Sequence, residues 1–214
     1  MGDGLKSWAS GSYFKDHDGM LQRWFHGTDA DEPFNIFAHC DDASLGFHFG
    51  SAAAANDRLS QISVDDDDFA GNIIPVFCRA ANPLVLADLY TWGQWSVASA
   101  LRDCGILAED EAEFVAGSTS AEMIYAAIEE AGYDCVLYTN ACESRDTGEM
   151  SLMIWRAALV KGIHSLEFEK EDPRILSQLP VSDDERRWFE YREAEIDRCR
   201  EELRALRFPH LAPA

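Results

Sequence analysis

The fold is decided by two stretches, Leu21-Gln-Arg-Trp-Phe-His-Gly-Thr28 and, shortly after it, Gly46-Phe-His-Phe-Gly-Ser51. The apolar and aromatic residues before His26 predict a strand, and Phe47 to Phe49 predict a second, short one. A strand that ends in histidine and glycine presents a ring nitrogen, a bare backbone amide and a carbonyl side by side. Those groups suit a flat carboxamide and a ribose hydroxyl, so the pattern indicates a site for a nicotinamide nucleotide.

Helices and strands are mixed along the rest of the chain. Strands are expected at residues 73–79, 84–86, 133–138 and 151–155, and helices after Ser51 and at residues 92–104, 109–115 and 119–131. Pro75 makes the first of these an edge strand or a bulged one. Thr119 and Glu122 form a capping-box pattern, and Gly132 supplies a left-handed stop. Because strict βαβ alternation is missing, we expect an α+β fold with a largely antiparallel split sheet, flanking helices and a long C-terminal helix.

Three parts are distinguished along the sequence. Residues 1–20 are rich in Gly, Ser and Asp and are expected to form a loosely ordered lead-in. This lead-in packs only through its aromatic rings, which belong to Trp8, Tyr13 and Phe14. Residues 21–165 carry the expected nucleotide-binding domain, and residues 172–208 form a C-terminal helical appendage.

The appendage is a long charged helix that begins with a second capping box, Ser182-x-x-Glu185. Its expected apolar face comprises Trp188, Tyr191, Glu195, Cys199, Leu203 and Leu206. This face docks on the main domain or pairs with a partner helix. We expect the helix to be dispensable for nucleotide binding and to affect stability or target contact.

The chain of 214 residues is strongly acidic, with 39 Asp and Glu against 18 Lys and Arg and a formal net charge of -21. Such a surface repels phosphate backbones, so direct binding to nucleic acid is disfavoured. A basic protein partner is favoured instead, although the same charge can serve solubility alone.

The six cysteines include no Cys-x-x-Cys pair, so neither a disulfide scaffold nor a zinc framework is expected. His39 and Cys40 beside Cys78 lack the spacing of a metal site, and no metal is expected. No apolar stretch approaches the roughly 20 residues that span a bilayer. We therefore expect a soluble protein without a membrane partner, in the cytoplasm of the producing cell or of a target cell.

The two opening stretches together resemble the ADP-ribosyltransferase superfamily, most closely its compact bacterial and phage-type members. These carry a His-Gly-Thr strand end and later a Phe-x-Phe-Gly-Ser/Thr segment before an Ala-rich helix with an arginine. The resemblance implies that NAD is bound and consumed as a substrate. It implies that His26 binds a ribose hydroxyl, that the backbone of Gly27 pairs with the carboxamide, and that Thr28 supports the turn or touches the adenosine side.

In that family the small second strand places an aromatic ring against the nicotinamide, and here this position falls on His48. Phe47 and Phe49 flank it and line the site, or, because strand side chains alternate, belong to the core. The resemblance also allows Ser51 and Arg58 to meet a ribose and a phosphate. Arg58 can instead pair with Asp57 or Asp65.

A carboxylate is needed to steady the oxocarbenium-like transition state of nicotinamide cleavage. Alignment of the strand at 151–155 puts Ser151 where many members have their glutamate. In the phage-type members a Tyr-x-Asn-x-x-Glu segment precedes a Ser-led strand, and Tyr138-x-Asn140-x-x-Glu143 resembles it. Glu143 is therefore the first choice and Glu149 the second, although either can be a solvated loop acid.

The resemblance thus implies a mono-ADP-ribosyltransferase that modifies a protein, as a toxin, an effector or a counter-defence protein. One alternative is a non-catalytic acidic binding or inhibitor protein on the same fold, because Ser151 stands in the glutamate position. The other is an RNA 2'-phosphotransferase-like enzyme, against which the negative charge argues. Patterns of P-loop, Rossmann, serine-hydrolase and zinc-protease sites are absent from the sequence.

Overall fold

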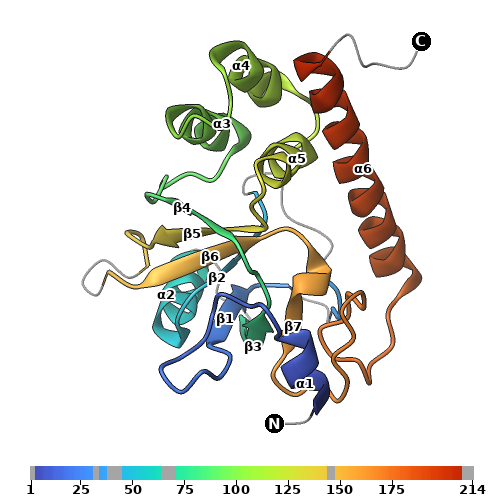
Figure 1. Ribbon diagram of the computed structural model, residues 1–214. Coiled ribbons are helices and arrows are strands. Elements are labelled where there is room, and N and C mark those ends of the chain that lie inside the picture. Colours follow the sequence, from blue (N-terminus) through green and yellow to red (C-terminus); the bar gives the residue numbers. More distant parts are fainter. Residues whose placement is uncertain (1–2, 31–33, 38–44, 64–70, 144–147, 209–214) are drawn as a thin grey trace.

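The computed structural model describes residues 3–30, 34–37, 45–63, 71–143 and 148–208. Its elements (Figure 1) are α1 (Asp3–Trp8), β1 (Arg23–Thr28), β2 (Phe47–Phe49), α2 (Ala52–Ile62), β3 (Asn72–Cys78), β4 (Pro83–Leu86), α3 (Gln94–Asp103), α4 (Glu109–Gly117), α5 (Glu122–Glu130), β5 (Cys135–Thr139), β6 (Met150–Ile154), the 3-10 helix η2 (Ala157–Leu159), β7 (Val160–Gly162) and α6 (Asp183–Arg207).

The strands form two sheets. One has the order β1-β3-β7, and the other has the order β2-β6-β5-β4. All pairs are antiparallel except β4 with β5. Helices α3, α4 and α5 cover one side of the four-stranded sheet, while α1 and α2 lie on the other side of the molecule (Figure 1). The expected mixture of helices with largely antiparallel, separate sheets and a long C-terminal helix is confirmed.

Both alternatives expected for the strand that contains Pro75, an edge position or a bulge, are wrong, because β3 lies between β1 and β7 and pairs with β1 residue for residue. Pro75 is opposite Phe25, whose own backbone groups bond to Gly50 on the far side of β1. The missing N–H of Pro75 faces the β7 side, where strand pairing stops at Val76. A proline is tolerated inside the sheet because no ladder bond is required of its nitrogen there, while its carbonyl accepts from the amide of Ile163 at 3.2 Å.

Before the C-terminal helix, two of the expected helix-end patterns are confirmed and a third is wrong. Ser51 caps α2 by accepting from the amide of Ala54 at 3.1 Å, and Gly132 adopts a φ of +89° after α5. Helix α5 begins only at Glu122, with Ala121 at the cap position, so Thr119 lies too early to form the expected box. The Ser120 hydroxyl donates to the Glu122 carboxylate instead.

The first twenty residues are more ordered than their composition predicts. Residues 3–8 form α1, and Trp8 is fully buried against the ring of Phe168. Phe14 is buried as well, whereas Tyr13 is mostly exposed. Two of the three aromatic rings expected to pack therefore do so, and a helix accompanies them.

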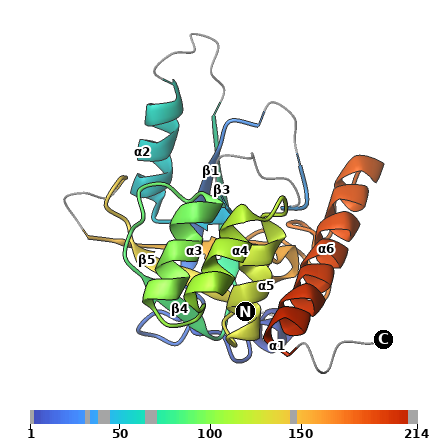
Figure 2. The same ribbon diagram turned by 90° about the horizontal axis from the view of Figure 1, so that it is seen from above.

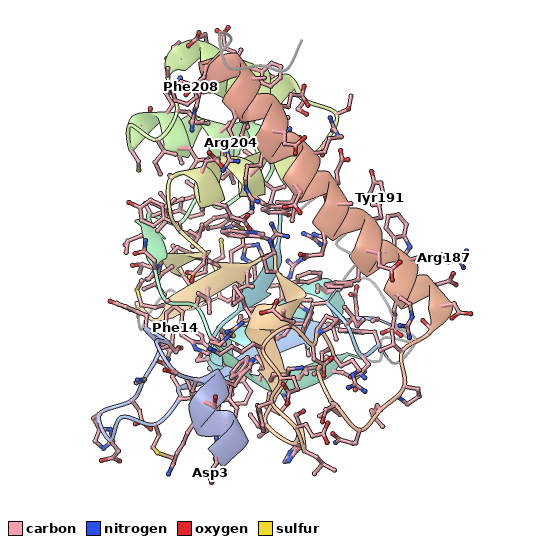
Figure 3. The ribbon with its side chains drawn as sticks, turned by 45° about the vertical axis from the view of Figure 1, so that its right-hand side comes forward. Asp3, Phe14, Arg187, Tyr191, Arg204 and Phe208 are labelled. Carbon is pink, nitrogen blue, oxygen red and sulfur yellow. The ribbon has the colours of Figure 1, made fainter. Side chains whose placement is uncertain are left out.

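Helix α6 packs along α5 on the outside of the molecule (Figures 2 and 3). Its Ser182–Glu185 capping box is formed, and the expected docking on the main domain is confirmed. The expected apolar face is partly wrong, because Trp188 and Tyr191 are 49% and 57% exposed. The buried residues of the helix are Arg192, Ile196, Cys199 and Leu203. The observed face shares Cys199 and Leu203 with the expected one, while Arg192 and Ile196 take the places expected for Tyr191 and Glu195.

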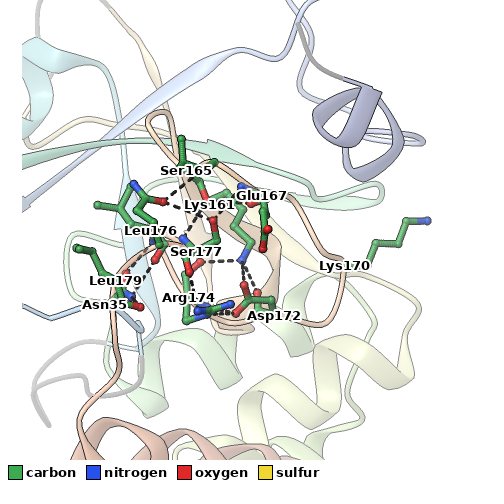
Figure 4. Close-up of polar contacts among 12 residues, drawn as sticks. Asn35, Lys161, Ser165, Glu167, Lys170, Asp172, Arg174, Leu176, Ser177 and Leu179 are labelled. Atoms are coloured by element: carbon green, nitrogen blue, oxygen red, sulfur yellow. Dashed lines mark hydrogen bonds and ion pairs between the residues drawn. The ribbon is translucent and has the colours of Figure 1, made fainter.

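The short strand β7 was not expected, and its central residue explains why. Lys161 is fully buried, and its Nζ donates to the carbonyl oxygens of Asp172 and Arg174 at 2.7 Å each (Figure 4). It also forms an ion pair with the carboxylate of Asp172. A lysine in a strand interior masks the pattern by which a buried strand is recognised.

Candidate functional site

Strands β1 and β2 meet at one point and then separate. The amide of Phe25 donates to the carbonyl of Gly50 at 2.9 Å, and the amide of Gly50 donates back at 3.0 Å. This bridge is isolated, since β1 otherwise pairs with β3 and β2 with β6. Residues 25–28 and 47–50 therefore diverge from a common point, and we call this place the β1–β2 fork.

The backbone of Gly27 points into the fork. Amide directions alternate along a strand, so Gly27 presents its N–H and C=O to the same side as Phe25, away from β3. Phe25 uses that side for Gly50, whereas no backbone partner among the described residues takes the N–H or C=O of Gly27. One donor and one acceptor are thus offered together, which is the complement of a planar carboxamide.

Gly27 is also required by packing. A Cβ added to it would lie 2.7 Å from the carbonyl oxygen of Ala55 and 3.3 Å from Cγ of Leu59. Only glycine therefore allows α2 to approach β1 this closely. Because Ser51 caps α2, the second stretch begins the helix that covers the first.

His26 holds the base of the fork. Its Nδ1 lies 2.8 Å from the carbonyl oxygen of His48. A carbonyl can only accept, so Nδ1 carries the proton and donates it. Burial lowers the pKa of His26, which keeps the ring neutral and leaves a lone pair on Nε2. The ring packs against the aromatic rings of Phe37 and Phe49, at centroid distances of 5.2 and 5.5 Å, and those two rings contact each other.

The ring of His48 points to the opposite face of β2. Phe47 and Phe49 are buried on the side of His26, as the core alternative for them predicts, while His48 packs edge-on against Trp92 at 5.2 Å. Burial lowers the pKa of His48 to about 4. The expected stacking of this ring on nicotinamide beside His26 is not what the arrangement offers, because the two imidazoles lie on different faces.

His48 ends a hydrogen-bond chain whose direction is determined at both ends. Its Nε2 donates to the carbonyl of Leu45 at 2.9 Å, so in the neutral ring Nδ1 accepts from the hydroxyl of Tyr138, also at 2.9 Å. Ser151 is hydrogen-bonded to Tyr138, and the side-chain amide of Asn140 donates to Ser151 Oγ at 2.9 Å. Protons therefore point from Asn140 through Ser151 and Tyr138 to His48. Buried chains of this kind are rigid.

The same chain positions the loop that carries Glu143. The Oδ1 of Asn140 accepts from the amide of Glu143 at 2.8 Å, and Asp88 accepts from the amide of Ala141 at 2.7 Å. Burial raises the pKa of Tyr138, and the nearby charges of Glu143 and Asp88 raise it further. Glu143 is thus held near the buried chain, with its backbone constrained and its side chain half-buried.

Glu149 lies on the other side of this loop. Its backbone carbonyl accepts from the backbone amide of Asn140 at 2.9 Å. Its Oε2 is buried without a hydrogen-bond partner among the described residues. Together with Gly50, Ser51 and Arg23 it lines a depression of about 450 Å³ beside the fork. A buried carboxylate oxygen without a partner costs free energy, which is common at sites that bind a ligand.

Thr28 ends one arm of the fork, and Arg58 lies on α2, the helix that packs on β1. Arg58 is exposed and forms no ion pair with Asp57 or any other described residue, while Asp65 lies outside the described residues. Its charge is close enough to His48 to lower the pKa of that ring slightly. The hydroxyl of Thr28 accepts from the amide of Ala30 at 3.2 Å, so it supports the turn, one of its two expected roles.

The structure thus gathers most of the predicted residues around the fork: His26, Gly27, Thr28, Phe49, Ser51 and Glu149. It places His48 and Glu143 on the neighbouring buried chain. Sequence reasoning missed Asp88 and the linking roles of Tyr138 and Asn140. Tyr138 and Asn140 belong to the Tyr-x-Asn-x-x-Glu segment that singled out Glu143, so the sequence did point to them. Asp88 follows a short strand and belongs to no recognisable motif.

Comparisons with protein-family models, with curated proteins and with solved structures found no match to this chain. Among the described residues, no group of three or more His, Cys, Asp or Glu side chains is arranged to hold a metal ion. His39 and Cys40 lie outside those residues. In the same part of the chain, no helix combines the length and apolar character of a membrane span.

Proposed function

We propose that this protein is an NAD-dependent mono-ADP-ribosyltransferase with an ADP-ribosyltransferase-like split sheet. It transfers ADP-ribose from NAD to a protein and releases nicotinamide. The observation that supports this best is the β1–β2 fork, where the backbone N–H and C=O of Gly27 have no partner among the described residues and follow His26, whose Nε2 carries a lone pair. The first pair suits the carboxamide, and the second accepts a proton from a ribose hydroxyl.

Cleavage of the bond between nicotinamide and ribose does not need a strong general acid, because nicotinamide leaves as a neutral base from a cation. Positioning and electrostatics supply most of the rate. The neutral His26 ring is suited to holding a hydroxyl without adding positive charge next to the developing ribosyl cation. Its Nδ1 bond to His48 prevents the ring from turning.

A carboxylate must steady that cation, and Ser151 cannot do so. Its hydroxyl is buried within the chain between Asn140 and Tyr138. Glu143 follows the family-like segment and is held by Asn140, which supports it as the first candidate. Glu149 is supported by its unpartnered oxygen and its place beside Gly50. The carboxylate role belongs to one of these two acids.

The other end of NAD carries phosphates, which the start of α2 and Arg58 suit. Helix N-termini present free N–H groups and a positive dipole end to anions. Arg58 is exposed on the same helix and has no ion pair among the described residues. An acceptor protein with a basic surface suits the charge of -21 of this chain. The chain itself would act in the cytoplasm as a toxin, effector or counter-defence enzyme.

A non-catalytic acidic binding protein remains the second candidate, and one observation favours it. The residue in the usual glutamate position, Ser151, is built into the core and leaves no carboxylate on the β6 strand itself. In that case the fork binds a nucleotide, or nothing, and the acidic surface carries the function. An RNA 2'-phosphotransferase-like activity is disfavoured, because RNA binding needs basic residues.

Binding of NAD tests the proposed site. At 100 times its dissociation constant a ligand stabilises the folded state by about 2.7 kcal/mol. For a chain of this size that raises the melting temperature by about 5–11 °C. His26→Ala should abolish the rise relative to its own melting temperature, and Arg58→Ala should weaken it less. His17→Ala, on a side chain that is 90% exposed, is the matched control and should keep it.

Absence of any rise with millimolar NAD in the wild-type protein, with FAD and ATP equally without effect, would overturn the nucleotide site. A rise that survives His26→Ala in full would place the nucleotide elsewhere than in the fork.

A further inference from the structure

We infer that helix α6 positions the nucleotide site through Arg192 and Glu185. This inference rests on the proposed function for its ligand but not for its geometry. The two side chains leave α6 two turns apart, and both lead to the aromatic cluster that surrounds His26. Arg192 acts on β2, and Glu185 acts on the segment that carries Phe37.

The first connection runs from Arg192 to the start of β2. Arg192 is only 6% exposed, and its Nη2 donates to the hydroxyl of Tyr125 at 3.0 Å. That same hydroxyl accepts from the amide of Gly46 at 2.7 Å. The guanidinium also lies over the ring of Phe47, 5.1 Å from its centroid. Arg192 therefore contacts Phe47 of β2 directly, and it also contacts the Tyr125 hydroxyl that holds Gly46, the residue before Phe47.

The backbone conformation and packing at Gly46 admit no other residue without a shift of its neighbours. Its φ of +69° is one that other residues rarely adopt, and a Cβ would lie 2.6 Å from Cγ of Met153. Tyr125 is equally constrained, because its ring is stacked on Trp155 at 5.3 Å with an interplanar angle of 9°. The path from Arg192 to β2 thus consists of rigid parts, and β2 supplies the carbonyl of His48 that orients His26.

The second connection runs from the capping box of α6. Glu185 Oε2 accepts from the amide of Ser182, while Oε1 accepts from the amides of Asn35 and Ile36. Burial raises the pKa of Glu185, but these hydrogen bonds lower it by more, so the group is ionised. The next residue, Phe37, is 1% exposed and packs edge-on against the ring of His26 at 5.2 Å.

Asn35 is clamped from the other side as well. Its side-chain amide donates to the carbonyls of Leu176 and Leu179 at 3.0 and 3.1 Å, and its Oδ1 accepts from the amide of Leu176 at 2.7 Å (Figure 4). The segment that places Phe37 is therefore fixed between the start of α6 and the chain just before it.

The helix itself is firmly attached, so it can hold these groups in place. Ion pairs along its length join it to the rest of the domain: Arg156 with Glu193, Arg200 with Glu129, Arg204 with Glu130 and Arg207 with Glu111. This arrangement differs from the expectation that α6 is dispensable for nucleotide binding.

Variants of the full-length protein test the inference. Tyr125→Phe removes one hydroxyl but keeps the stacked ring, and Arg192→Gln removes the guanidinium. Arg198→Gln, on the exposed side of α6, is the matched control. Two quantities are measured: the NMR signals of the ¹⁵N-labelled His26 ring without ligand, and the KM and kcat for NAD with nicotinamide release as the readout.

We expect both variants to shift the His26 ring signals and to raise the KM for NAD about tenfold, while Arg198→Gln changes neither. The double variant should be no worse than the more severe single one, because both changes act on one path. Glu185→Gln should shift the same ring signals through Phe37.

Unchanged ring signals in Tyr125→Phe and Arg192→Gln, with only a lower melting temperature, would overturn the inference and leave α6 a purely stabilising element. If wild-type protein binds no NAD, the proposed function fails, and the ring signals still decide the positioning role by themselves.

Discussion

Replacing Gly27 by alanine tests the contact on which the fork depends. The new Cβ would lie 2.7 Å from the carbonyl oxygen of Ala55, where an ordinary contact needs about 3.4 Å, so α2 or β1 must move by roughly 0.7 Å. The nearest atom belongs to helix backbone and cannot turn aside. Overpacking of this kind costs about 1–3 kcal/mol. For a chain of this size the melting temperature should fall by about 2–12 °C.

The assay is thermal unfolding followed by circular dichroism, with and without NAD. Gly117→Ala is the control, because nothing lies within 4 Å of its Cβ position, and it should be neutral or slightly stabilising. Gly27→Ala should also lose the stabilisation by NAD, since the strand edge is displaced. A melting temperature equal to that of wild type would refute the close packing of α2 on β1.

Three further predictions concern stability. Because the pKa of His48 is about 4 when folded and 6.5 when unfolded, the unfolded state binds more protons in between, and acidification from pH 7 to pH 5 should cost about 2 kcal/mol through this ring alone. His48→Gln should lose less stability than wild type over this range, and what it still loses includes the contribution of His26, whose pKa is lowered as well. Ser151→Ala leaves the Asn140 amide without its acceptor and should cost about 1–3 kcal/mol in urea unfolding, while the exposed Ser60→Ala should not. Arg156→Ala leaves the half-buried Glu129 without its main cation and should cost about 2–4 kcal/mol, whereas an equal loss in the exposed Arg198→Ala would contradict this.

Local signals in the sequence predicted local structure well. The strand that carries His26, the cap at Ser51 and the long helix after Ser182 depend on neighbouring residues only, and all three form, the strand running from Arg23 to Thr28. The place of Pro75 within the sheet was not predictable in this way, because it depends on where β7, far along the chain, stops pairing. The buried side of α6 depends likewise on what Arg192 meets.

The site shows the same division. The sequence placed His26 and Gly27 at a strand end, and the fork follows from that position. It could not show that His48 faces away from His26, since this depends on the register of β2 against β6. Nor could it show that Tyr138 lies opposite Ser151, a pairing across thirteen residues that creates the buried chain. Polar groups that meet only through strand register leave no periodic pattern.

Release of nicotinamide from NAD tests the central claim most directly. Wild-type protein, incubated with NAD labelled in its ADP-ribose part and a bacterial lysate, should release nicotinamide and label an acceptor protein. Removing the one well-placed carboxylate should cut turnover by about 10² or more while NAD binding persists, and we expect this of Glu143→Gln and a mild effect of Glu149→Gln. The reverse ranking would move the role to Glu149. Full activity of the double variant, or wild-type protein that binds NAD but never releases nicotinamide with any acceptor, would contradict the proposed catalysis.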